Sequence, residues 1–151
     1  MGKSPTSSAE WYTVQEASRI VVLSVDMLNY LSRYGIAVAS GSRQRGRGRP
    51  RRYTFADLVL LRAIAQLLQR GVSVLRLKQS LVAAHKRGQA TADLLSRRYL
   101  LTDGYNVYFQ DSGSLELLET GQMAFAFVLE LTGVRTSVKE SIERERSVQR
   151  A

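Results

Sequence analysis

Apolar residues recur at helical spacing in four stretches of the first two thirds of the chain. The pattern predicts helices over about residues 14–20, 25–34, 55–70 and 74–88. Each stretch follows a hydroxyl side chain that can accept a hydrogen bond from a free backbone N–H group at a helix start. These predicted N-caps are Thr13, Ser24, Thr54 and Ser73. A carboxylate, Glu16 or Asp57, stands three residues after each of the two threonines, so both sites predict a reciprocal capping box.

Each of the last three predicted helices has one apolar face, and these faces define a candidate core. In the second helix the face consists of Met27, Leu28, Leu31 and Tyr34. In the third it consists of Phe55, Leu58, Leu61, Ile64, Ala65 and Leu68, and in the fourth of Val74, Leu77 and Leu81. Only residues 21–23 separate the first helix from the second, which is the spacing of a helix-turn-helix motif.

The C-terminal third of the chain has strand-like patterns instead. Asp103-Gly104, a strong two-residue hairpin signal, separates residues 99–101 from residues 105–109. Large side chains alternate with smaller or polar ones over residues 123–131, which predicts a further strand. We expect a small antiparallel sheet, with one face covered by a helix that begins at about Ser137.

An arginine-rich segment, residues 40–52, connects the second and third predicted helices. It contains six arginines and no acidic residue. Its glycines and Pro50 disfavour a helix, and an extended basic segment suits the groove of a polyanion, with DNA as the leading candidate. Residues 47–50, Arg-Gly-Arg-Pro, match the core of an AT-hook, which lays two arginines along an A·T-rich minor groove. The alternative interpretation is a solvated basic tail that binds without sequence preference.

Composition narrows the possible classes of function. The formal net charge is +9, divided into +12 over residues 1–98 and −3 over residues 99–151. The chain has no cysteine and one histidine, His85, which argues against disulfides and against a metal site built on Cys or His. It has no apolar stretch of membrane-spanning length, and residues 1–10 lack the apolar core of a signal peptide. We therefore expect a cytoplasmic, nucleoid-associated protein without a membrane partner. No cluster of nucleophile, acid and base appears, so we expect neither an enzyme nor a cofactor.

A series of short motifs runs in order through residues 11–82. They are Tyr12-Thr13-Val14, Glu16-Ala17, Leu28, Tyr30, Arg33, Gly35-Ile36, Arg51, Tyr53, Asp57-Leu58, Leu61, Ile64, Gly71-Val72-Ser73 and Leu81. In this order they resemble the MerR-type winged helix-turn-helix transcription regulators. The resemblance implies that the second helix reads the major groove and that residues 40–52 form a wing. It also implies that Tyr30, Arg51 and Tyr53 contact the DNA backbone, although either tyrosine alone is equally consistent with a place in the core.

The sequence departs from the family pattern at three points. Asn29 stands where the family has Arg, so a contact there would be shorter and adenine is a possible partner. The wing is longer and richer in Arg and Gly than is usual. The long C-terminal helix through which the family dimerises as an antiparallel coiled coil is expected to be absent, as are its effector cysteines. We therefore assign dimerisation to residues 99–151.

Taken together, these patterns predict an α+β fold. A winged helix-turn-helix of about four helices precedes a small antiparallel β-sheet unit with a C-terminal helix. The predicted division is a disordered tail over residues 1–10, a DNA-binding domain over 11–88 and a β-rich dimerisation or interaction domain over 89–151. The predicted DNA contacts are Ser24, Val25, Asp26, Asn29, Tyr30, Arg33, Arg43, Arg45, Arg47, Gly48, Arg49, Arg51, Arg52 and Tyr53.

The predicted function is sequence-specific binding of double-stranded DNA by a homodimeric transcription regulator. Two alternatives use the same N-terminal domain. One is an architectural or recombination-directionality protein whose output is DNA bending. The other is an antitoxin-like protein that represses its own operon and holds a protein partner through residues 99–151.

Overall fold

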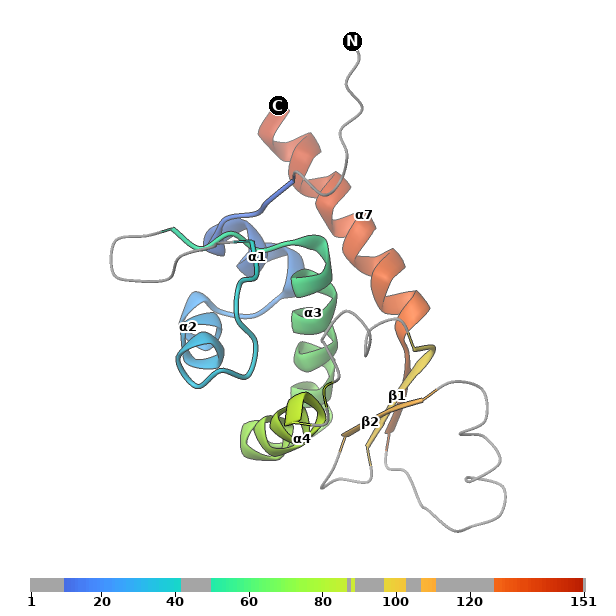
Figure 1. Ribbon diagram of the computed structural model, residues 1–151. Helices are drawn as coiled ribbons and strands as arrows, with labels where there is room; N and C mark the ends of the chain where they lie inside the picture. Colours follow the sequence, from blue (N-terminus) through green and yellow to red (C-terminus); the bar gives the residue numbers. More distant parts are fainter. Residues whose placement is uncertain are drawn as a thin grey trace.

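The computed structural model describes residues 10–41, 50–86, 88, 97–102, 107–110 and 127–150. Its elements are α1 (Val14–Val21), α2 (Val25–Arg33), α3 (Phe55–Gln69), α4 (Val74–Lys86), β1 (Tyr99–Thr102), β2 (Val107–Gln110), β3 (Phe127–Glu130) and α7 (Leu131–Arg150). The four N-terminal helices, the small sheet and the C-terminal helix confirm the predicted α+β class (Figure 1). Nearly all of the predicted N-terminal tail, residues 1–9, lies outside the described residues.

Local hydrogen bonds cap the N-termini of the first four helices at the residues that the sequence predicts. The hydroxyls that accept from the backbone at these helix starts are those of Thr13, Ser24, Thr54 and Ser73. At α1 the capping box is complete, because Glu16 N–H donates to Thr13 Oγ1 at 3.1 Å and Thr13 N–H donates to Glu16 Oε1 at 2.9 Å. The same reciprocal arrangement opens α3. These caps satisfy backbone donors that a helix start otherwise leaves unpaired.

The turn between α1 and α2 contains Val22 in the left-handed conformation, with φ 62° and ψ 49°. This backbone conformation is unfavourable for a β-branched residue, and the Val22 side chain is 62% exposed. The turn brings the inner faces of the two helices together. Their buried residues are Ala17, Ile20, Val21, Leu28 and Leu31. The predicted helix-turn-helix is therefore present.

Helix α3 is buried on more than its predicted face. Four predicted core residues, Leu58, Leu61, Ile64 and Ala65, are buried, and Phe55 and Leu68 are partly buried. The neighbouring positions Val59, Leu60, Ala63 and Leu67 are buried as well. The additional burial arises because α3 packs against both α1 and α7. In α4, Leu77 and Leu81 are buried as predicted, and Val74 is partly buried against the same core.

The sheet has three antiparallel strands in the order β2-β1-β3. Tyr99 pairs with Gln110 and Thr102 with Val107, which confirms the predicted hairpin. The connection between the paired ends is four residues, 103–106, and not the two-residue turn predicted at Asp103-Gly104; these four residues lie outside the described residues. Strand β3 pairs with β1 on the other side. Residues 123–126 of the predicted third strand also lie outside the described residues.

The C-terminal helix differs from the prediction in length and in packing. It begins at Leu131, a residue predicted to end a strand, and continues for 20 residues to Arg150. Its buried apolar residues recur at helical spacing: Leu131, Val134, Val138 and Ile142. The expectation that a long C-terminal helix is absent is wrong. Helix α7 lies along α1 and α3 of the same chain (Figure 1), rather than acting mainly as the cover of the sheet.

The N-terminal helices, the sheet and α7 share one cluster of buried residues. Arg62 of α3 reinforces this junction. Its Nη1 donates to the carbonyl oxygen of Ile20 at 3.1 Å, and its Nη2 donates to Ser137 Oγ at 3.0 Å. One guanidinium therefore ties the C-terminal end of α1 to α7, and its charge is favourable beside a helix C-terminus.

Candidate nucleic-acid interface

Helix α2 has one buried face and one polar face. Leu28 and Leu31 are fully buried, and Met27 packs partly against the core. The predicted contact residues of this helix comprise exposed Ser24, Asp26, Tyr30 and Arg33 and half-buried Val25 and Asn29. The outer face therefore offers hydrogen-bonding groups of several kinds, as a helix that enters a DNA groove requires.

Tyr34 lies outside the core, which corrects the prediction that it belongs to the apolar face of α2. Its side chain is 46% exposed, and its ring centroid lies 4.7 Å from that of Tyr30, itself 41% exposed. Lys78 of α4 places Nζ 5.3 Å from the Tyr34 ring centroid. Two phenol rings and an ammonium group thus gather on one surface beside α2, and phosphate is a ligand that suits them. No sequence pattern pointed to Lys78, since only the tertiary structure brings α4 to α2.

The two ends of the arginine-rich segment meet at a closed base. Gly41 N–H donates to the Arg52 carbonyl oxygen at 2.8 Å, and Tyr12 and Tyr53 exchange backbone hydrogen bonds of 2.9 and 3.0 Å. The Arg52 guanidinium carbon lies 4.5 Å from the centroid of the Trp11 ring, which is a cation–π contact. A Cβ on Gly41 would lie 2.5 Å from that carbonyl oxygen, so glycine is required for this close approach.

Asp57 attaches the start of the arginine-rich segment to α3. Its carboxylate accepts from Ser40 N–H at 2.8 Å, from Ser40 Oγ at 2.9 Å and from Thr54 N–H at 2.9 Å. The side chain is buried, and these three donors supply the hydrogen bonds that a buried carboxylate needs. The same residue therefore completes the cap of α3 and holds the chain where it enters the wing.

At the other end of the segment, the Arg51 side chain is directed toward α2. Its Nη1 donates to Asn29 Oδ1 at 2.7 Å. The sequence predicted both residues as DNA contacts but gave no indication that they touch.

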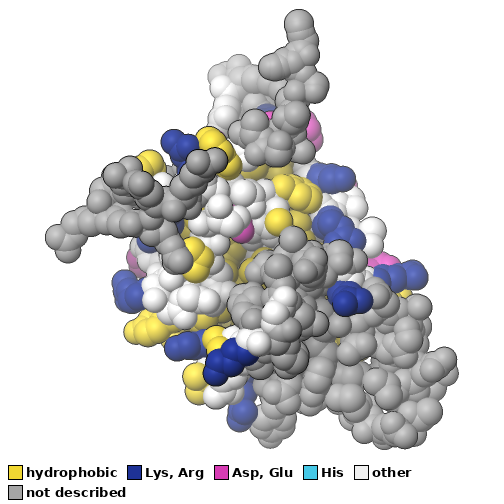
Figure 2. All heavy atoms as spheres, in the orientation of Figure 1, with side chains coloured by type: hydrophobic (Ala, Val, Ile, Leu, Met, Phe, Trp, Pro, Cys, Tyr) yellow, Lys and Arg dark blue, Asp and Glu magenta, His cyan; other side chains and the backbone are white. Residues whose placement is uncertain are grey.

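Lys and Arg side chains are also visible along the side of the molecule formed by α2 and α4 (Figure 2). The described ends of the wing, α2 and α4 thus form one polar surface with several cationic groups.

Comparison with known proteins identifies this arrangement. Residues 12–83 match the family model described as MerR HTH family regulatory protein. Those residues form a MerR-family helix-turn-helix domain. Uncharacterized HTH-type transcriptional regulators of Mycobacterium bovis and Mycobacterium tuberculosis are each 30% identical to this chain over 130 residues, which is 82% of the chain and 56% of the relative. The chain thus spans just over half the length of these curated relatives. The match is to a regulatory domain and not to an enzyme.

Within the MerR-type domain, Tyr53 belongs to the core. Its side chain is 1% exposed, and its hydroxyl is buried without a hydrogen-bond partner among the described residues. Because DNA cannot reach this ring in the observed conformation, its predicted contact with the DNA backbone is not retained.

The other predicted contact residues of the wing divide into two groups. Arg51 and Arg52 lie at the described base, whereas Arg43, Arg45, Arg47, Gly48 and Arg49 lie outside the described residues.

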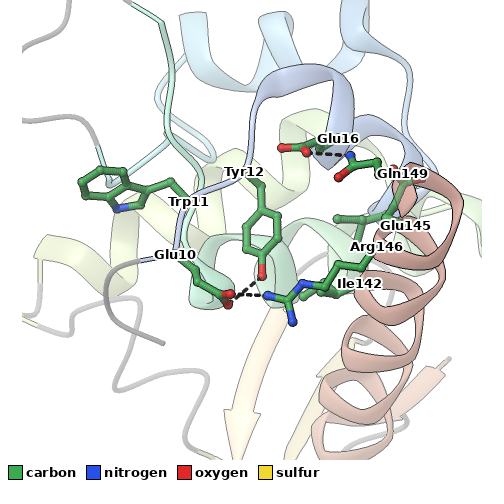
Figure 3. A pocket seen from close by; sticks show the side chains of 9 residues that line it. Glu10, Trp11, Tyr12, Glu16, Ile142, Glu145, Arg146 and Gln149 are labelled. Carbon is green, nitrogen blue, oxygen red and sulfur yellow. Dashed lines mark hydrogen bonds and ion pairs between the residues drawn. The ribbon is translucent and has the colours of Figure 1, made fainter. Parts of the chain in front are cut away.

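The MerR-type domain is joined to the C-terminal half of α7 by polar contacts as well as by its core. A pocket of about 200 Å³ lies between this half of the helix and residues 10–20 (Figure 3). Arg19 Nε donates to both oxygens of Glu145 at 3.0 Å, and Gln149 Nε2 donates to Glu16 Oε2 at 3.0 Å. Burial alone would raise the pKa of Glu16, but hydrogen bonds from Thr13 and Gln149 outweigh it and lower that pKa.

In the described part of the chain, no three His, Asp or Glu side chains gather closely enough to hold a metal ion. No described helix combines the length and apolar character needed to cross a membrane.

Proposed function

We propose that this protein is a sequence-specific regulator of transcription that binds double-stranded DNA as a homodimer. The observation that carries the proposal is the contact between Asn29 of α2 and Arg51 of the wing base on one polar surface of a MerR-type domain. Helix α2 lies in the major groove, where base edges present distinct donor and acceptor patterns. Tyr30, Tyr34 and Lys78 contact the phosphates beside it.

The arginine-rich wing extends this interface into the minor groove. Arg47 and Arg49 lie along the floor of an A·T-rich tract in the manner of an AT-hook, and Gly48 leaves room for the close approach. Arg43, Arg51 and Arg52 hold phosphates at the base of the wing. The concentration of positive charge, six arginines in residues 40–52, supports this assignment.

The homodimer is formed through residues 99–151, which include the sheet edges β2 and β3. Two copies place two recognition helices on half-sites about 34 Å apart, one turn of B-DNA. Because α7 packs against α1 and α3, the dimer is tested on the full chain. Light scattering should give twice the chain mass, and footprinting should show two protected half-sites. A monomer that protects a single half-site would contradict the dimer without contradicting DNA binding.

The DNA-binding proposal is tested by selecting sites for the full chain from a random duplex pool. Equilibrium binding then compares the selected duplex with a random one. Asn29→Ala and Arg33→Ala should each cost about 1 to 3 kcal/mol more on the selected duplex than on the random one. If the pool yields no enriched sequence, or if both duplexes lose affinity equally, α2 does not read bases.

The wing is tested with duplexes that differ only in an A·T tract beside the selected site. The double variant Arg47→Ala with Arg49→Ala should lose most affinity on the tract-containing duplex. Gly48→Val should weaken binding although it removes no charge. As a matched control, Arg43→Ala should leave tract preference unchanged and reduce the slope of log K against log salt by about 0.9. Uniform losses in all variants would favour a nonspecific basic arm.

A further inference from the structure

The position of Arg51 is set by the fold of the wing base. The chain is held on the C-terminal side of Arg51, because the Arg52 carbonyl accepts from Gly41 N–H and Tyr53 pairs with Tyr12 through two backbone hydrogen bonds. From this anchored backbone the Arg51 side chain reaches Asn29, in the middle of α2. The contact therefore connects two elements that are each fixed independently.

The chemistry of the two side chains determines which way the Asn29 amide faces. A guanidinium has only donors, so it can bond only to the amide oxygen and not to the amide nitrogen. The observed Nη1···Oδ1 distance of 2.7 Å is typical of a charge-assisted bond. Assignment of oxygen and nitrogen, which is ambiguous for an isolated amide, is thus settled by the partner. The NH₂ group of Asn29 is directed away from Arg51.

We propose that Arg51 sets the base that Asn29 reads, so that the pair selects guanine over adenine at one base pair; this inference rests on the proposed function. An unconstrained Asn recognises adenine by donating to N7 and accepting from the N6 amino group. Here one of the two lone pairs of the accepting oxygen is bound to Arg51. An adenine N6 amino group would have to share that oxygen with the guanidinium, whose positive charge repels a second donor. Guanine offers N7 and O6, both acceptors, and both suit a donor-only amide beside a cation.

In this arrangement Arg51 is a positioning residue as well as a phosphate ligand. A ligand of phosphate alone changes affinity equally for all sequences, because the backbone carries no base information. A residue that orients Asn29 changes the preference at one base pair instead. The two roles therefore differ in a measurable quantity, the ratio of affinities for duplexes that differ at a single position.

The experiment uses the full chain and the duplex obtained by selection. The base pair read by Asn29 is the one whose preference disappears in Asn29→Ala. Four duplexes carrying each base at that position are then compared by fluorescence anisotropy. The wild-type protein should favour guanine over adenine by about 10- to 100-fold. Arg51→Met removes the donors but keeps the apolar stem, and it should reverse or erase this ratio because adenine no longer has to share the amide oxygen with a cation.

Two further variants make the outcome decisive. The double variant Asn29→Ala with Arg51→Met should show the same flat base preference as Asn29→Ala alone, since the two residues act together. Arg52→Met, the neighbouring arginine that stacks on Trp11, should lower affinity for all four duplexes equally. A wild-type preference for adenine would overturn the proposal. So would an Arg51→Met protein whose guanine preference is intact, provided that thermal unfolding shows it to be folded. Failure to select any duplex would instead reject the proposed function.

Discussion

Substitution of Asp57 should destabilise the protein and loosen the entry to the wing. The carboxylate is 7% exposed and accepts from two backbone N–H groups and one hydroxyl, at 2.8 to 2.9 Å. Hydrogen bonds to a charged group contribute about 1.5 to 3 kcal/mol each, but desolvation of the carboxylate offsets part of the sum. Asp57→Ala also leaves the N–H groups of Ser40 and Thr54 without their partner.

We expect Asp57→Ala to lower the free energy of unfolding by about 2 to 4 kcal/mol, a large part of the 5 to 15 kcal/mol typical of a domain. Asp57→Asn keeps the shape and one acceptor, so its loss should be smaller, about 1.5 to 3 kcal/mol. Asp26, an exposed carboxylate in the first turn of α2, provides the matched control. Asp26→Asn should change stability by no more than about 0.5 kcal/mol.

Urea unfolding followed by circular dichroism measures the loss, and the fluorescence of Trp11, the single tryptophan, reports the wing base separately. In Asp57→Ala, the Trp11 signal should change at lower urea than the helical signal, because Ser40 immediately precedes Gly41 of the closed base. An Asp57→Ala protein as stable as Asp26→Asn would refute the anchoring role of this carboxylate.

Three other predictions follow from single contacts. Gly41→Ala should weaken DNA binding and cost about 1 to 3 kcal/mol in unfolding free energy, because its methyl group would overlap the Arg52 carbonyl oxygen; wild-type stability would contradict this. Val22→Gly should stabilise the protein by about 0.5 to 1 kcal/mol in urea unfolding, since relief of the left-handed strain exceeds the entropy that glycine adds to the unfolded chain. The lowered pKa of Glu16 makes its contribution to stability present above pH 4.5, its usual value, and lost as pH falls through the folded-state value. Glu16→Gln should therefore flatten the decline of stability below pH 4.5, and an unchanged pH profile would contradict the lowered pKa of Glu16.

Helix starts and the hairpin were predictable because the interactions that specify them are local. Thr13 and Glu16, like Thr54 and Asp57, lie three residues apart, so their capping bonds form within one helical turn wherever that turn lies in the fold. Pairing of β1 with β2 likewise depends on a short connection. The order of the family motifs likewise identified the helix-turn-helix before any contact was known.

The start of α7 and the elements against which it packs depended on tertiary structure. Its apolar positions, Leu131, Val134, Val138 and Ile142, are compatible with a helix, but alternation before Leu131 suggested a strand and the charged tail suggested a solvated surface. The helix is favoured because it packs against the faces of α1 and α3, which are apolar and would otherwise be exposed. A hydrophobic stripe shows that a helix must be covered, but it does not identify the element that covers it.

The details of the candidate interface were also decided by distant contacts. Arg51 and Asn29 are 22 residues apart, and no periodicity links them. Tyr53 and Tyr34 are chemically alike, yet one is buried and the other lies beside Lys78 on the surface. Residue type and local spacing determine where helices begin and which groups are available for recognition. The packing of separate elements determines which of those groups become buried, paired or presented to DNA, because burial and hydrogen bonding depend on neighbours that are remote in the chain.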